Sequence, residues 1–180
     1  MMAPDTSSDS PIHASGQSCV IQEADLDRMM TRHEQLACLC DLLEACADSL
    51  PVWPTDTQAE RLRLALGAFV EGEREGDAFI TRIFGWAGQD PLAAALMRHV
   101  DARHTDDLVH AEDLIAALQA GPVPNGRISA ETFGYMLRCF FAAGRQSMVL
   151  DEFAVLALGR DHLTASGQSL LFDSLCRRAS

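Results

Sequence analysis

The chain has 180 residues, of which 48% are hydrophobic and 22% are charged, and it carries a formal net charge of -12. This length and hydrophobic content favour one globular domain, with a core large enough to fold without a disulfide or a structural metal. The acidic balance argues against a nucleic acid or an anionic membrane as the partner. We therefore expect a metal ion, a small molecule or another protein in that role.

The N-terminal segment is interpreted as a flexible tail over residues 1–21, followed by the domain over residues 22–180. Residues 1–18 contain no Lys or Arg and no continuous apolar run, so they lack the regions that define a signal peptide. No segment approaches the roughly 20 apolar residues that cross a bilayer. These features predict a cytoplasmic protein.

The six cysteines form no C-x-x-C pair. Cys38, Cys40, Cys46 and Cys139 lie within predicted helices among apolar neighbours. In the absence of an export signal, this pattern favours buried reduced thiols over disulfides or a redox pair.

Four long segments show helical periodicity, and none alternates as a half-buried strand does. They cover about 22–49, 58–86, 90–119 and 130–159, and a short terminal helix is predicted after Thr164. Four helices joined by short loops pack most economically side by side in alternating directions. The sequence therefore predicts an all-α fold, an up-down-up-down four-helix bundle with a short C-terminal helix.

Capping and turn residues mark the ends of these helices. Leu50 and Pro51 end the first helix, and Thr57 and Glu60 have the spacing of a capping box at the start of the second. Asp90 precedes a proline, which is typical of the start of the third helix.

Each predicted helix places at least one polar residue on its apolar face when the helix is followed at about 100° per residue. His33 lies on the apolar stripe of the first helix, His104 near the centre of the third, and Asp151 on the fourth. Buried carboxylates without compensation cost several kcal/mol each, so they must be protonated, paired with a cation or bound to a metal. A metal site is the interpretation that uses all of these residues.

The second helix contains the acidic segment FVEGEREGDAFI, from Phe69 to Ile80. The phase of its apolar residues places Glu73 and Asp77 toward the core and Glu71 and Glu75 toward solvent. We therefore take Glu73 and Asp77 as the candidate ligands from this helix.

Three segments resemble the first, third and fourth helices of the hemerythrin-like, HHE-type domains of bacteria. They are HEQLACLCDLLEACADSLP, RHTDDLVHAEDLIAAL and SMVLDEFAVLALGRDHLT, which begin at residues 33, 103 and 147. The resemblance spans about residues 25 to 175. Members of this family are four-helix bundles that hold a non-haem di-iron centre. The resemblance therefore implies reversible binding of dioxygen, nitric oxide or iron rather than catalytic turnover.

Carried onto this chain, the resemblance makes His33 and His104 imidazole ligands and Asp151 the acidic ligand of the fourth helix. Asp107 stands where relatives often have Asp, as an occasional ligand or the partner of one. Ser147 stands where the family has a histidine, and serine is a poor ligand for iron. The family pattern is therefore incomplete on the fourth helix.

The second helix departs further from the family. One alignment puts Val70 and Arg74 at the ligand positions, and a shift of one residue gives Glu71 and Glu75. The apolar phase instead favours the candidates chosen above, and no alignment supplies a histidine.

Two outcomes remain open. In the first, a carboxylate-rich site binds one or two non-haem iron ions, or manganese or zinc, which accept the same mixed ligands. In the second, the site is degenerate, Arg74 or Arg103 neutralises the acids, and the bundle is a metal-free interaction or regulatory module with a protein partner or a second copy of itself. A di-metal oxidase is a third hypothesis. The ligands in the first outcome are His33, Glu73, Asp77, His104 and Asp151.

Overall fold

The computed structural model describes residues 21–84, 90–121 and 128–178, with the backbone alone over residues 75–84. Within these ranges the chain forms α-helices and one short 3-10 helix and contains no strand, which confirms the all-α prediction. The predicted helix ranges agree with the observed ones to within two residues at each end. The elements are α1 (Glu23–Ser49), α2 (Asp56–Phe84), α3 (Pro91–Ala120), α4 (Ala130–Gly159), η2 (Arg160–His162) and α5 (Ala165–Arg178).

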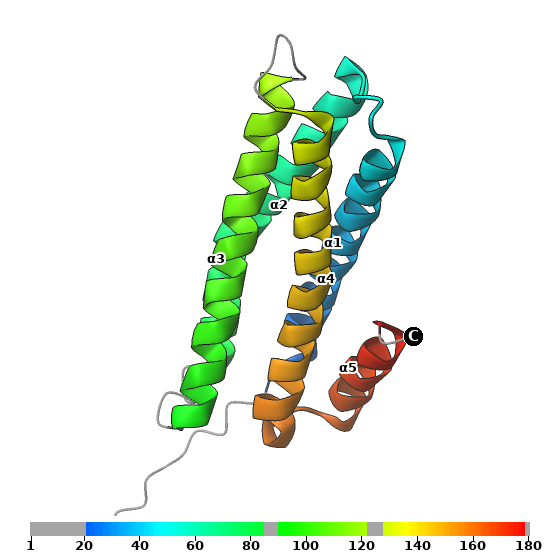
Figure 1. The fold of residues 1–180 in the computed structure, drawn as a ribbon. Coiled ribbons are helices and arrows are strands. Elements are labelled where there is room, and N and C mark those ends of the chain that lie inside the picture. Colours follow the sequence, from blue (N-terminus) through cyan, green and yellow to red (C-terminus); the bar gives the residue numbers. More distant parts are fainter. Residues whose placement is uncertain (1–20, 85–89, 122–127, 179–180) are drawn as a thin grey trace, which may run out of the picture.

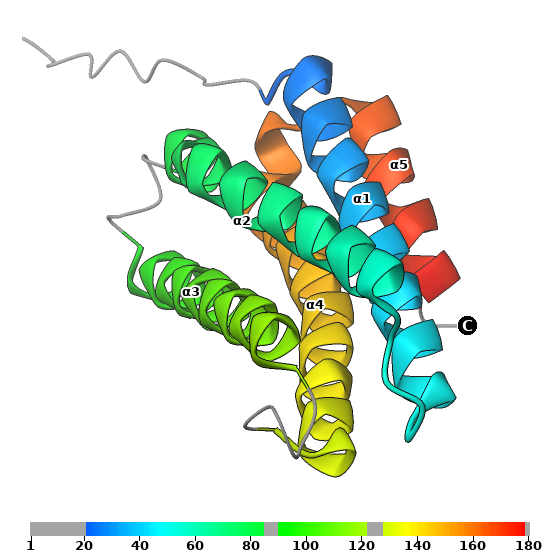
Figure 2. The same cartoon turned by 90° about the horizontal axis from the view of Figure 1, so that it is seen from above.

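The five α-helices pack together (Figures 1 and 2). The most extensive contacts join α4 to α1 and α3, and α2 packs against α3 and, less extensively, against α1. The shorter α5 packs on α4, on the side away from α3 (Figure 1). Each of the four long helices therefore has two long neighbours, which leaves one face of each available for a shared interior.

The interior contains two apolar clusters. One includes Leu26 of α1 and Val155 of α4, and the other includes Leu43 of α1 and Phe140 of α4. All four side chains are at most 1% exposed, and burial of each contributes roughly 1.5–3 kcal/mol. Polar residues that fall between the two clusters along a helix, such as His33, are therefore held in a layer with apolar packing on both sides.

The helix starts differ from the prediction at one place. Thr55 Oγ1 accepts from the backbone N–H of Gln58, and Gln58 Oε1 accepts from the backbone N–H of Thr55 at 2.9 Å. These reciprocal bonds form a capping box two residues earlier than the predicted pair Thr57 and Glu60. The prediction was wrong because both pairs have the same spacing, and α2 begins at Asp56.

The predicted start of the third helix at Asp90 is confirmed, because Asp90 accepts from the backbone N–H of Leu92 at 2.9 Å. Thr164, after which the terminal helix was predicted, caps that helix, since its Oγ1 accepts from the backbone N–H of Gly167 at 3.1 Å. Gly167 also lets α5 approach α1 closely, because a Cβ atom there would lie 2.8 Å from Cδ1 of Leu26.

The predicted tail lies outside the described residues except for Ile21. This residue belongs to the folded domain, because it is buried and its backbone N–H donates to the carbonyl of His162 at 3.0 Å. The rest of the predicted tail stays a prediction.

Cys38, Cys40, Cys46 and Cys139 are free thiols. Cys40 is buried, and burial raises the pKa of its thiol to about 12. Cys38 is exposed, so the expectation of a buried thiol was wrong there. None of the helices in the described ranges is long and apolar enough to cross a membrane.

Candidate metal site

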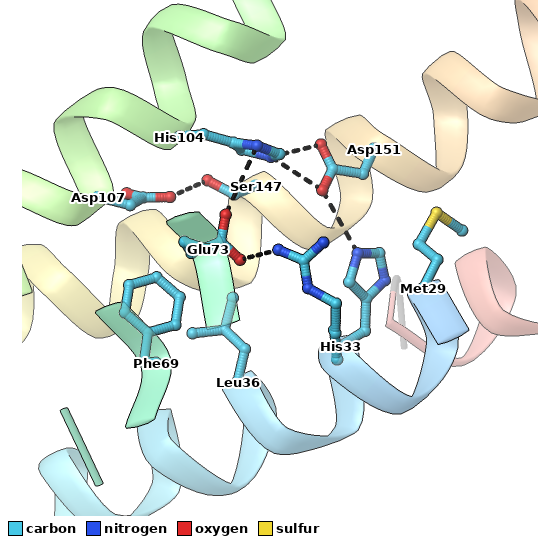
Figure 3. A pocket seen from close by; sticks show the side chains of 10 residues that line it. Met29, His33, Leu36, Phe69, Glu73, His104, Asp107, Ser147 and Asp151 are labelled. Carbon is cyan, nitrogen blue, oxygen red and sulfur yellow. Dashed lines mark hydrogen bonds and ion pairs between the residues drawn. The ribbon is translucent and has the colours of Figure 1, made fainter. Parts of the chain in front are cut away.

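Each of the four long helices contributes a polar side chain to one buried cluster (Figure 3). His33 of α1, Glu73 of α2, His104 of α3 and Asp151 of α4 line a cavity of about 20 Å³, enough for roughly one water-sized group. Four of the five predicted ligands therefore meet at one place. The rest of the wall is formed by Met29, Arg32, Leu36, Phe69, Asp107 and Ser147.

Asp151 lies at the centre of this cluster. Both of its carboxylate oxygens lie 3.0 Å from Nε2 of His104, and Oδ2 lies 3.4 Å from Nε2 of His33. Asp151 is 7% exposed and His33 is 5% exposed. Two imidazoles from different helices thus face one carboxylate that has little access to water.

The other ring nitrogen of His33 faces a second buried acid. Nδ1 lies 2.9 Å from Oε1 of Glu152, which is fully buried and also accepts from Nε of Arg178 at 3.0 Å. Because an ionised carboxylate only accepts hydrogen bonds, Nδ1 carries the proton. Nε2 then faces Asp151 either with a second proton or with a lone pair that could bind a cation.

The electrostatics of the metal-free cluster favour the second proton. Burial is the largest single effect on His104 and opposes its charge, but the hydrogen bond to Asp151 and the nearby charges of Asp151, Glu73 and Asp107 together outweigh burial and raise the pKa to about 9. Burial likewise opposes the charge of His33, but hydrogen bonds to Asp151 and Glu152 and the charges of these acids together raise its pKa. Burial alone would raise the pKa values of Asp151 and Glu152, yet their histidine partners lower both. Without a metal, these shifts favour imidazolium–carboxylate pairs in the cluster.

Glu73 lies at the edge of the cavity. Its Oε1 accepts from Nη2 of Arg32 at 2.6 Å, and Oε2 lies 3.7 Å from Nδ1 of His104. The side chain of Glu73 is 14% exposed, whereas that of Glu71 is 73% exposed. The apolar phase therefore placed these two acids on the correct sides of α2.

Ser147 and Asp107 form a second polar group beside the cavity. The Ser147 hydroxyl donates to Oδ2 of Asp107 and accepts from Nε of Arg103 at 3.2 Å. Oδ1 of Asp107 lies 4.0 Å from the same Arg103 nitrogen and accepts no hydrogen bond from the described residues. Burial raises the pKa of Asp107, although the bond from Ser147 opposes the shift. This carboxyl group thus retains an unused acceptor next to the cavity.

Other predicted residues lie elsewhere. The side chains of Asp77 and Glu75 fall outside the described ones, so their predicted orientations remain predictions. Arg74 pairs at the surface with Glu112 at 2.8 Å and does not reach the buried acids.

Three charged residues of the cluster were missed by the sequence analysis. Arg32, rather than Arg74, neutralises Glu73, and Glu152 with Arg178 supports His33. A signal for Glu152 was present, because it lies four residues after Met148 and therefore on the same apolar face of α4.

The donor atoms fit one metal ion only after rearrangement. As the side chains stand, no three His, Cys, Asp or Glu residues in the described ranges are arranged to hold a metal. The physical reason is that the imidazole nitrogens and the carboxylate of Asp151 point at one another rather than at a common centre. Their separations of 3.0 and 3.4 Å nevertheless match those of neighbouring donors bound to one ion at about 2.1 Å.

A larger groove of about 1000 Å³ runs between α1 and α2 and adjoins the cavity. The two share Arg32 and Glu73, whose ion pair lies where they meet, and also Leu36 and Phe69. The groove follows from the limited packing between α1 and α2.

The fold and the cluster together define an all-helical protein with a buried histidine–carboxylate site built from four helices. Comparison of the chain with protein-family models, with curated proteins and with solved structures finds no match. What the site does is therefore argued from its own geometry.

Proposed function

We propose that the chain is a divergent hemerythrin-like protein that binds one metal ion, non-haem iron, between His33, His104 and Asp151. It acts in the cytoplasm as a sensor, store or carrier of dioxygen, nitric oxide or iron, without catalysis. The observation that carries the proposal is that the Nε2 atoms of two imidazoles from different helices face one buried carboxylate. Glu73 is the further oxygen ligand from α2.

The arrangement of the helices supports the family assignment. In Figure 1, α1 and α3 run upward and α2 and α4 run downward, as an up-down-up-down four-helix bundle requires. Metal sites of such bundles are built from inward-pointing side chains of facing helices. His33 on α1 and His104 on α3 are in the positions that the resemblance assigns to ligands.

The donor set supports one ion rather than two. Ser147 takes the place of a family histidine and is engaged with Asp107 and Arg103. Glu73 is shared with Arg32, which competes with a metal for its carboxylate. Two imidazoles and two carboxylates supply donors of the kinds that one iron, manganese or zinc ion accepts.

Charge balance makes the exchange of protons for a metal feasible. The surrounding carboxylates raise the pKa values of His33 and His104, which favours a second proton on each ring in the metal-free cluster. A divalent ion carries the same charge as these two protons, so it can replace them without leaving new uncompensated charge. Binding then releases protons, as is general for metal sites with imidazole ligands.

The test is metal analysis of protein purified without chelators. We expect about one equivalent of iron per chain. His33→Ala and His104→Ala should abolish uptake, whereas His99→Ala should retain it, because His99 is an exposed residue of the same helix as His104. Substoichiometric metal that is lost on dialysis would contradict the proposal.

A second candidate function is a metal-free interaction or regulatory module. It is favoured by the arginines, because Arg32 and Arg178 already pair with Glu73 and Glu152, and Arg103 lies beside Asp107. For such a module, replacement of a whole buried ion pair by apolar residues should be neutral or stabilising. Its partner would be another protein or a second copy of the chain, and the metal analysis above separates it from the first.

A further inference from the structure

Glu152 links the proposed ligand His33 to the C-terminal helix. Its Oε1 atom accepts from Nδ1 of His33 on one side and from Nε of Arg178 on the other, at 2.9 and 3.0 Å. Glu152 has no exposed surface, so water does not replace either partner. The path from α1 through α4 to α5 consists of two direct contacts.

Arg178 reaches Glu152 only while α5 is docked. It lies in the last turn of α5, whose inner face holds the fully buried Leu171 and the buried Ser174. Gly167 allows the close approach of this helix to Leu26 of α1. The position of the guanidinium group is therefore set by the packing of the whole helix.

The partner of a metal-binding imidazole fixes the orientation and the tautomer of the ring. Here Glu152 holds the proton on Nδ1 of His33, which leaves Nε2 for the metal. Loss of Arg178 would leave Glu152 as a buried charge without its guanidinium partner, and a carboxylate in that situation shifts toward other hydrogen-bond donors. Such a shift disturbs the bond to His33.

We propose that Glu152 and Arg178 are positioning residues for His33, and that the docking of α5 and the binding of metal stabilise each other. The metal in this proposal rests on the proposed function. The link between His33 and α5 rests on the two contacts of Glu152. Coupling between two events is reciprocal in free energy. Metal binding must therefore hold α5 in place as strongly as α5 supports metal binding.

The first test compares the affinity of variants for Zn²⁺, which is redox-inert and accepts the same ligands. Replacement of a residue that orients a ligand costs about 10- to 100-fold in affinity. We expect a loss of that size for Glu152→Gln and Arg178→Gln, and partial rescue by Arg178→Lys. Arg177→Gln is the matched control, because Arg177 is the exposed neighbour on the same helix. Unchanged affinity in Glu152→Gln would overturn the proposal.

The second test separates coupling from a merely structural role. Amide hydrogen exchange in α5 should slow when Zn²⁺ is added to the wild-type protein, and this response should be lost in Arg178→Gln. A merely structural Arg178 would change the exchange rates of α5 but leave them insensitive to metal in both proteins. That outcome would also overturn the proposal.

A third test needs no metal and keeps the two proposals distinguishable. Urea unfolding of the chelator-treated wild-type protein, His33→Gln, Arg178→Gln and the double variant forms a double-mutant cycle. His33 and Arg178 share Glu152 as partner, so their effects should be non-additive. If the wild-type protein binds no metal, the proposed function fails while this cycle still tests the link. Additive effects would show that no link exists.

Discussion

Nε2 of His104 lies 3.0 Å from each carboxylate oxygen of Asp151, so one nitrogen of α3 is shared between both oxygens of one residue of α4. Such a symmetric contact is strong when the imidazole is charged, because a carboxylate and an imidazolium attract each other more strongly where water is excluded. It also holds α3 and α4 in register at the height of the cavity.

Asp151→Asn should lose metal uptake and destabilise the metal-free protein. The amide keeps the shape of the side chain but removes the charge that faces His33 and His104, so we expect a loss of about 2–3 kcal/mol in the free energy of unfolding. Metal analysis and urea unfolding measure the two effects. Asp113→Asn, at an exposed site of α3, should change stability by less than about 0.5 kcal/mol. Equal behaviour of the two variants would contradict the central role of Asp151.

Glu73→Ala and Glu71→Ala should behave differently although they lie two residues apart on α2. Glu73→Ala removes a proposed ligand and leaves Arg32 without its carboxylate, so metal uptake should be lost. Glu71→Ala changes an exposed side chain and should retain uptake, with a stability change of about 0.5 kcal/mol or less. Metal analysis of both proteins checks this prediction. The reverse pattern would favour the shifted family alignment, which places Glu71 and Glu75 at the ligand positions.

The same contrast is predicted one turn later, between Asp77→Ala and Glu75→Ala. If the helical phase continues, the first variant loses metal and the second keeps it. Metal analysis of these two proteins decides the orientation of both side chains.

The stability of the chelator-treated protein should fall between about pH 6.5 and pH 9. The pKa of His104 rises from 6.5 to about 9 in the folded state, because its bond to Asp151 and the charges of Asp151, Glu73 and Asp107 together outweigh burial. A raised histidine pKa contributes stability that is complete below about pH 6.5 and is lost as the pH rises through about 9. One proton gives a slope of at most about 1.4 kcal/mol per pH unit. Urea unfolding across this range measures it, and His104→Gln should flatten the profile. An unchanged slope in that variant would assign the effect to other groups.

Thr55→Ala should destabilise the protein by about 1 kcal/mol, because it removes the capping box of α2. Thr57→Ala should cost about 0.5 kcal/mol or less, since Thr57 is exposed within the first turn. Thermal or urea unfolding of the two variants decides between the observed cap and the one that the sequence suggested. A larger effect at Thr57 would contradict the observed helix start.

Helical periodicity predicted the elements and the inward direction of Glu73 well, because a long helix averages the phase over many apolar residues. It also placed His33, His104 and Asp151 on inward faces. Periodicity could not distinguish two capping boxes of equal spacing, since the residue at which the helix begins depends on the conformation of the preceding loop.

The charged partners were harder to predict. Arg32 lies on α1 outside the apolar stripe that contains His33. It reaches Glu73 through the length and flexibility of its side chain, which helical periodicity does not describe. Arg178 meets Glu152 only through the packing of α5 on α4, a long-range arrangement that no local pattern contains. Cys38 was misplaced because its apolar neighbours are intermixed with positions that line the open groove between α1 and α2.

That groove has a kinetic consequence. It brings solvent to the Arg32–Glu73 ion pair, on whose far side the cavity lies. For an ion or a diatomic gas that enters by this route, the exchange rate depends on how often the pair opens, whereas the equilibrium affinity depends on the donors behind it. Salt weakens partly exposed ion pairs. The residence time of a bound ligand could then shorten with ionic strength while the order of preference among ligands stays the same.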